Sequence, residues 1–137
     1  MKTSHDVLDI LHPVVNVATV TGTIDGKVYR NARPQNSKLR DVVLVPLTIR
    51  NNPNEDTNES TVQPGTMIAN CYAPNLDKGE PDIAHLKVAA AAVVSVIEAY
   101  SNASTYYVFK IISENTMNDL ENPDQSYSSL RINYFFE

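Results

Sequence analysis

The sequence predicts an α+β fold: an antiparallel or mixed β-sheet of four to five strands packed on one long α-helix, with a short N-terminal helix. Three observations predict it. Apolar residues recur at helical spacing after Asp82, β-branched and aromatic segments lie on both sides of that stretch, and Asp25-Gly26 marks a tight turn. The 137 residues, of which 42% are hydrophobic and 20% charged, fit a single domain over residues 1–137.

The N-terminal segment, residues 1–20, is expected to form a short helix and an arm. Ser4 can cap the helix, and Pro13 is expected to limit it because the residue before a proline avoids helical geometry. Val14–Val20 is apolar and rich in β-branched residues, so its sequence is compatible with either a strand or an extended arm.

The long helix is expected from Ile83 to about Tyr100, with Asp82 as its N-cap. Four consecutive alanines, at 89–92, keep it thin enough to lie close to a sheet. Its predicted apolar stripe consists of Ile83, Leu86, Ala90, Val93, Val94, Ile97 and Tyr100. No apolar run approaches the roughly 20 residues that span a bilayer, so we expect no membrane contact.

Five strands and two long connections are expected in the rest of the chain. The strands are Lys27–Asn31, Asp41–Ile49, Gly65–Tyr72, Thr105–Ile112 and Tyr127–Phe136. Pro46 has no N–H for a strand ladder, so its strand is expected at a sheet edge or interrupted there. The connections are a long polar loop at 50–64, expected to be functional or disordered, and an acidic loop or poor helix over Glu114–Gln125.

Consecutive aromatic residues on the last two strands place rings on both faces of the sheet. They are Tyr106, Tyr107, Phe109, Tyr134, Phe135 and Phe136. One face should pack under the long helix. The other face is either covered by the N-terminal helix or forms a contact surface, and the sequence leaves both possibilities open.

Charge is unevenly distributed along the chain. The net charge of −5 argues against a dedicated nucleic-acid binder. A basic stretch nevertheless lies between Asp25 and Arg40, and an acidic one between Glu114 and Asp124. The two could be solvated loops, or could meet across copies in a head-to-tail ring. The candidate inter-subunit contacts are Lys27, Arg30, Arg33, Lys38, Arg40, Asp119, Glu121 and Asp124.

We expect no enzyme, no metal and no cofactor. His5 and His12 lack the i, i+4 spacing of a helical zinc pair, and His85 is expected to be a partly buried or surface histidine. The single cysteine, Cys71, is expected to fill the core, because the sequence places no helix N-terminus or partner base beside it. There is no nucleophile elbow and no phosphate loop. The first six residues are too polar for a signal peptide, so we expect intracellular synthesis.

A series of short motifs carries a resemblance that covers nearly the whole chain. In order, these motifs are Gly26–Tyr29, Arg33–Val43, Ala69–Pro74, Pro81–Leu86 and Arg131–Phe136. The series resembles the small tail-completion and tail-terminator (neck) proteins of tailed bacteriophages. Arg40 stands where that family commonly has an acidic residue, so tail terminator, tail completion and head–tail connector proteins all stay open.

The resemblance implies a non-enzymatic virion protein. Such a protein forms a homo-oligomeric ring, typically a hexamer in tail terminators, that caps the tail tube at its head-proximal end and joins it to the connector. It would reside in the virion neck or tail, and in the host cytoplasm during assembly, with DNA passing through the lumen without specific binding. Residues 14–20 and 51–64 are the segments expected to reach neighbours. The alternative is a monomeric cytosolic adaptor or small ligand-binding domain, which an open apolar pocket would favour.

Overall fold

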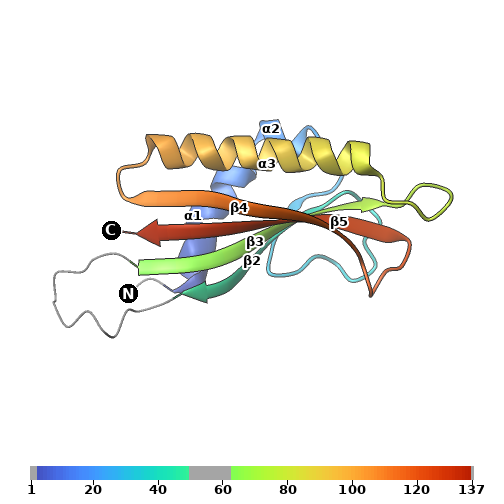
Figure 1. Ribbon diagram of the computed structural model, residues 1–137, viewed down its shortest axis with the longest axis horizontal. Coiled ribbons are helices and arrows are strands. Elements are labelled where there is room, and N and C mark those ends of the chain that lie inside the picture. Colours follow the sequence, from blue (N-terminus) through green and yellow to red (C-terminus); the bar gives the residue numbers. More distant parts are fainter. Residues whose placement is uncertain (1–2, 50–62, 137) are drawn as a thin grey trace.

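A computed structural model describes residues 3–49 and 63–136 and confirms the α+β class (Figure 1). A mixed five-stranded sheet carries one long helix and a short N-terminal helix. The helices are α1 (Ser4–Val15), α2 (Ala18–Thr21) and α3 (Ile83–Ala103). The strands are β1 (Val28–Arg30), β2 (Val42–Ile49), β3 (Gln63–Pro74), β4 (Tyr107–Asn118) and β5 (Gln125–Phe136).

The sheet has the strand order β1-β2-β3-β5-β4, in which β1 runs parallel to β2 and the other pairs are antiparallel. Because β1 pairs only with Val42 to Leu44, the rest of β2 lies at an edge of the described sheet. Pro46 falls in that part, and the register between β2 and β3 shifts between Pro46 and Thr48. The expected edge or interruption at Pro46 is therefore confirmed.

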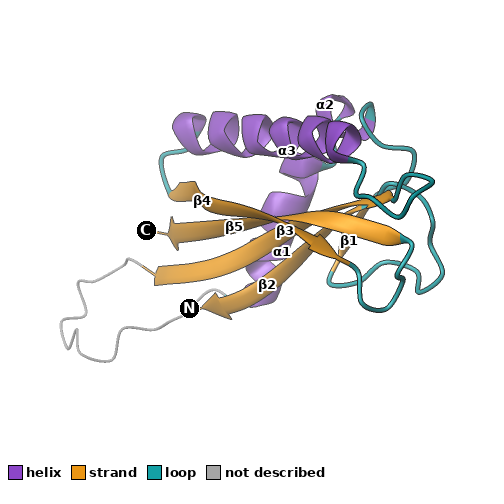
Figure 2. Ribbon diagram, turned by 45° about the vertical axis from the view of Figure 1, so that its right-hand side comes forward, coloured by secondary structure: helices purple, strands orange, loops and turns teal. Residues whose placement is uncertain are grey.

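All described helices pack on the same face of the sheet (Figure 2). α1 buries Val7, Leu8 and Leu11 in the same cluster that holds Val93 and Ile97 of α3. The possibility that the N-terminal helix covers the second face is therefore wrong. No helix from the described residues lies on that second face, which we call the helix-free face.

The N-terminal segment forms two helices, α1 and α2, separated only by Asn16 and Val17, so the predicted arm or strand over Val14–Val20 is wrong. Val15 and Val20 are fully buried, and burying each contributes roughly 1.5–3 kcal/mol. That gain offsets the backbone hydrogen bond lost at Pro13, which lies inside α1. The N-cap is Thr3 rather than Ser4: Thr3 Oγ1 accepts from the Asp6 N–H, and the Asp6 carboxylate accepts from the Thr3 N–H.

α3 begins as predicted, with Asp82 Oδ1 accepting from the His85 N–H at 3.4 Å. Its buried residues are Leu86, Ala89, Ala90, Val93 and Ile97. Ile83 was expected in this stripe but is 53% exposed. The helix is 21 residues long and contains an 18-residue stretch with a mean hydropathy of 1.5, so by length and composition alone it could span a membrane, contrary to the sequence-based expectation. In this fold the buried side chains of the helix pack in the hydrophobic core against the sheet.

The hairpin of β4 and β5 is longer than predicted. The segment from Glu114 to Asn118 was expected in an acidic loop or poor helix, but it is strand and pairs with Ser126 to Leu130. The Glu114 carboxylate accepts from the Ser128 hydroxyl across the two strands at 2.6 Å, which stabilises the pairing of the strands. The polar loop predicted at 50–64 lies outside the described residues, apart from Gln63 and Pro64, which begin β3.

Candidate interaction surface

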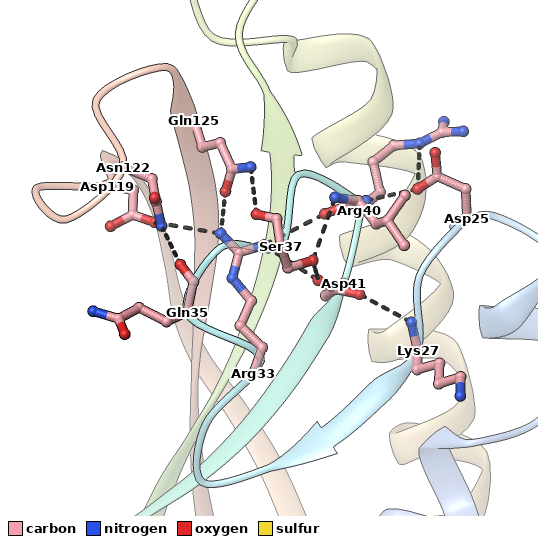
Figure 3. Close-up of polar contacts among 11 residues, drawn as sticks. Asp25, Lys27, Arg33, Gln35, Ser37, Arg40, Asp41, Asp119, Asn122 and Gln125 are labelled. Carbon is pink, nitrogen blue, oxygen red and sulfur yellow. Dashed lines mark hydrogen bonds and ion pairs between the residues drawn. The ribbon is translucent and has the colours of Figure 1, made fainter.

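Arg33 lies at the centre of a buried polar cluster at one end of the sheet (Figure 3). Its side chain is 7% exposed. The guanidinium lies 3.3 Å from Asp41 Oδ2 and 3.4 Å from Asp119 Oδ2, and it donates to the Gln125 side-chain carbonyl. Its Cζ lies over the ring of Tyr72, 3.7 Å from the ring centroid. The basic and acidic stretches therefore meet within one chain at this pair.

Asp41 organises the segment that carries Arg33. Its carboxylate is completely buried and accepts from the Ser37 hydroxyl at 2.6 Å and from the Lys27 N–H at 3.0 Å. Gly26 makes room for it, since a Cβ at that position would lie 1.8 Å from Asp41 Oδ1. Asn31, with φ 66°, turns the chain out of β1 in the left-handed region, where asparagine is one of the few residues that fit.

The same segment is fastened to the turn between β4 and β5. Gln125 donates to the Ser37 carbonyl at 2.8 Å, and Asn122 donates to the Gln35 carbonyl at 3.4 Å (Figure 3). Together with the Arg33–Asp119 pair, these bonds join parts of the chain that are 86 to 88 residues apart. The end of the sheet is therefore a rigid block rather than a set of independent loops.

A hollow of about 360 Å³ opens beside this cluster on the helix-free face. Its floor consists of Val43, Val45, Tyr72 and Tyr127, the two rings lying 5.0 Å apart, and exposed Leu120 forms part of its rim. Burial raises the pKa of Tyr72, although the charge of Arg33 opposes the shift. The phenol therefore stays protonated at neutral pH and acts as an apolar and hydrogen-bonding wall.

Exposed apolar side chains continue along the helix-free face. Val108 of β4 and Phe135 of β5 lie directly opposite each other and are 51% and 39% exposed. Next to them, the Thr66 hydroxyl donates to Asn133 Oδ1 at 3.2 Å. Apolar groups gathered on one uncovered face are typical of a contact surface.

The structure separates the eight charged residues predicted as inter-subunit contacts into two groups. Arg33 and Asp119 pair with each other, while Arg30 pairs with Asp9 and Arg40 with Asp25, all within the chain. The remaining four are exposed and take part in no ion pair among the described residues: Lys27, Lys38, Glu121 and Asp124. Contacts of any of the eight with another copy stay a prediction.

Two members of the cluster, Tyr72 and Gln125, were missed from the sequence. Arg33 and Asp41 both belong to the Arg33–Val43 motif, so the sequence itself indicated that they lie close together. Tyr72 and Gln125 come from strands far along the chain, and no local pattern marks them as partners of an arginine. The side-chain oxygen of Asn70 is buried and has no hydrogen-bond partner among the described residues, and the sequence did not predict this either.

Cys71, His12 and His85, the residues considered for chemistry, are each buried or in contact with groups of the fold. Cys71 is fully buried, and burial together with the charge of Glu114 raises the pKa of its thiol to about 12. His12 Nε2 lies 3.0 Å from the Val28 carbonyl, and His85 contacts the Asp82 carboxylate. Within residues 3–49 and 63–136, no group of three or more His, Cys, Asp or Glu side chains could hold a metal ion.

The sequence matches none of the known protein families and none of the curated proteins with which it was compared. The fold does have solved neighbours. A chain of the virion of a native gene transfer agent (GTA) particle is 18% identical with a TM-score of 0.54, over 93% of this chain and 84% of that chain. At this identity the likeness shows a shared fold.

Two crystal structures from Akkermansia muciniphila, one of them of a core domain, are more distant. They are 13% and 12% identical, with TM-scores of 0.39 and 0.32, and cover 71% and 68% of this chain. The matches span only 42% and 47% of those chains, so the likeness is too partial to support an argument.

Proposed function

We propose that this chain is a structural protein of a phage-like virion. In this proposal it forms a ring at the head-proximal end of the tail, caps the tail tube and joins it to the head–tail connector. The observation that carries the proposal is the fold shared with a chain of the GTA virion over 93% of this sequence. The ordered motifs that resemble tail-terminator and tail-completion proteins support the finer assignment.

The described surface suits an assembly role. The described helices all cover one face of the sheet, and the other face presents apolar groups to solvent. The Arg33 cluster holds one end of the sheet rigid, so a subunit would enter an assembly with little reorganisation of that end. Partners of this surface are further copies of the chain and the neighbouring tube and connector proteins.

The proposal is tested by placing the chain in particles. A tagged chain should copurify with intact particles from a producing host, and deletion of its gene should yield filled heads and separate tails. Restoring the untagged chain in trans should restore joined particles, which controls for effects on neighbouring genes. Absence of the chain from purified particles, with normal joining in the deletion strain, would contradict the proposal.

One observation favours a second candidate, a small ligand-binding domain. The hollow of about 360 Å³ combines an apolar floor with the polar Arg33 cluster at its rim, and small-molecule sites have this character. A thermal-shift screen of metabolites tests it. A ligand that stabilises the wild-type chain but not a Tyr127→Ala variant would support this function over the virion role.

A further inference from the structure

The described strand positions of the helix-free face carry only positive charges, although the chain is acidic overall. At the strand positions of this face that the structure describes, the charged side chains are Lys110 of β4 and Arg131 of β5, both exposed. On the same face, Lys110 follows the exposed Val108 by two positions along β4, and Arg131 precedes the exposed Phe135 by four positions along β5. We call these four residues the basic patch. Its sign is opposite to the net charge of −5.

The opposite end of the β4–β5 hairpin carries an acidic ridge, defined here as residues 76–80 and 119–124. The two segments lie side by side, because the Asn75 N–H donates to the Asp124 carbonyl at 2.8 Å and its side chain donates to the Pro123 carbonyl at 3.3 Å. The exposed charges of the ridge are Asp77, Lys78, Glu80, Glu121 and Asp124. Four carboxylates against one ammonium group make the ridge negative.

The acidic ridge also presents two uncovered leucines. Leu120 is 94% exposed and Leu76 is 50% exposed. Each of the two surfaces thus combines two exposed apolar side chains with exposed charges, and the charges have opposite sign. Complementary charge around apolar contacts is the arrangement that sets register and partner choice at protein interfaces.

The two surfaces cannot meet within one molecule. β4 is 12 residues long, which at about 3.3 Å per residue spans about 40 Å. Val108 and Phe135 lie at one end of the hairpin and the turn at 119–124 at the other (Figure 1). A contact between them requires two molecules and is heterologous, so that repetition closes a ring or extends a filament.

We propose that copies of this chain dock head to tail, with the acidic ridge of one copy on the basic patch of the next. Leu120 and Leu76 cover Val108 and Phe135, while the carboxylates of the ridge face Lys110 and Arg131. This inference rests on the proposed ring, and it assigns the two surfaces that make the ring contact.

A charge exchange tests the docking. One variant carries Lys110→Glu and Arg131→Glu, and the other carries Glu121→Lys and Asp124→Lys. Sedimentation velocity at low ionic strength should show wild-type self-association that added salt weakens. Each variant alone should associate at least tenfold more weakly. An equimolar mixture should associate as the wild type does, because each surface then meets one of opposite sign.

A matched control exchanges two exposed charges of α3, outside both surfaces. Lys87 and Glu98 are both exposed there, and a Lys87→Glu, Glu98→Lys variant should associate as the wild type does. Unchanged circular dichroism and melting temperatures for all variants would show that the charge changes leave the fold intact.

Three results would overturn the docking: a wild-type chain that stays monomeric at its highest soluble concentration, variants that associate normally, or a mixture that fails to recover. Binding of duplex DNA that depends on Lys110 and Arg131, without self-association, would assign the basic patch to nucleic acid instead. Failure of the virion role looks different, since docking would then occur in solution while the chain is absent from particles. A particle ring built through other surfaces would overturn the docking alone.

Discussion

Arg33 and Asp119, 86 residues apart in the sequence, form an ion pair of 3.4 Å between side chains that are almost fully buried. The pair joins the basic segment after β1 to the turn between β4 and β5. The sequence suggested that the basic and acidic stretches could meet between copies. This pair joins them within one chain. The consequences for stability can be measured directly.

Removing the Arg33 side chain should destabilise the fold strongly. Arg33→Ala would leave the buried carboxylate of Asp41 without its cation, which typically costs about 3–5 kcal/mol. Arg33→Lys should recover only part of the loss, because an ammonium group lacks the flat guanidinium that contacts Tyr72 and Gln125 at once. Urea unfolding monitored by circular dichroism measures the free energy of unfolding of both variants.

Lys38→Ala is the matched control for Arg33, because Lys38 lies in the same segment and is exposed. It should change the free energy of unfolding by less than about 0.5 kcal/mol. An Arg33→Ala variant as stable as Lys38→Ala would show that the buried cluster does not hold this end of the sheet together.

Gly65 should be sensitive to substitution because of Tyr134. A Cβ at Gly65 would lie 2.2 Å from the ring of Tyr134, which is fully buried on the neighbouring strand. Gly65→Ala should cost about 1–3 kcal/mol, as overpacking of cores does. In a Tyr134→Ala background the same change should cost far less. This double-mutant cycle, read by thermal unfolding, isolates the contact.

Gly79→Asn serves as the control for that series. Gly79 has φ 78° with open space around its Cβ position, and asparagine tolerates this region better than other side chains. It should be close to neutral. Additive effects of the changes at Gly65 and Tyr134 would contradict the packing described here.

Cys71 should be inert in the folded protein. Burial raises the pKa of its thiol to about 12, so at pH 8 a thiol reagent should label it only after unfolding. The unfolded chain releases this proton near pH 8.5, while the folded chain holds it, so stability should be constant below about pH 8 and fall as the pH rises above 9.

A Cys71→Ala variant should flatten that fall between pH 8 and 10. Tyr134, whose pKa burial also raises to about 12, contributes only above about pH 10, where an unfolded tyrosine ionises. Rapid labelling of the native wild-type chain at pH 8 would mean that the thiol is accessible and the core is looser than described.

Replacing Pro13 should strengthen α1. Pro13 is exposed and lies inside the helix, where it supplies no backbone N–H. Pro13→Ala should raise the free energy of unfolding by about 1–3 kcal/mol, measured by urea unfolding, whereas Val15→Ala should lower it. A loss of stability on Pro13→Ala would indicate that the proline is needed for the turn from α1 into α2.

Local patterns sufficed for much of the fold. α3 was predictable because Asp82 can cap it and its apolar residues recur at helical spacing, and both signals lie within the helix itself. Pro46 likewise indicated the edge of β2 by its missing donor. Val14–Val20 failed because β-branched residues favour strands locally, while burial of Val15 and Val20 against α3 and the sheet decides the outcome.

The candidate surface was less predictable than the fold. The charged stretches containing Arg33 and Asp119 were visible, but their meeting inside one chain depends on the sheet order that brings β5 beside β3. Glu114 was placed in a loop because its neighbours are polar, whereas pairing with β5, where it lies opposite Leu130 and accepts from the Ser128 hydroxyl, makes this segment a strand. Such partners come from long-range pairing, which a single sequence does not encode locally.

Electron cryomicroscopy of intact particles tests most directly the proposed ring of this chain at the head-proximal end of a tail. The account predicts a closed ring of copies of this chain between the tail tube and the connector, with density that fits the five-stranded sheet and α3. Particles whose neck density cannot be fitted by this chain, or that lack the chain altogether, would contradict it.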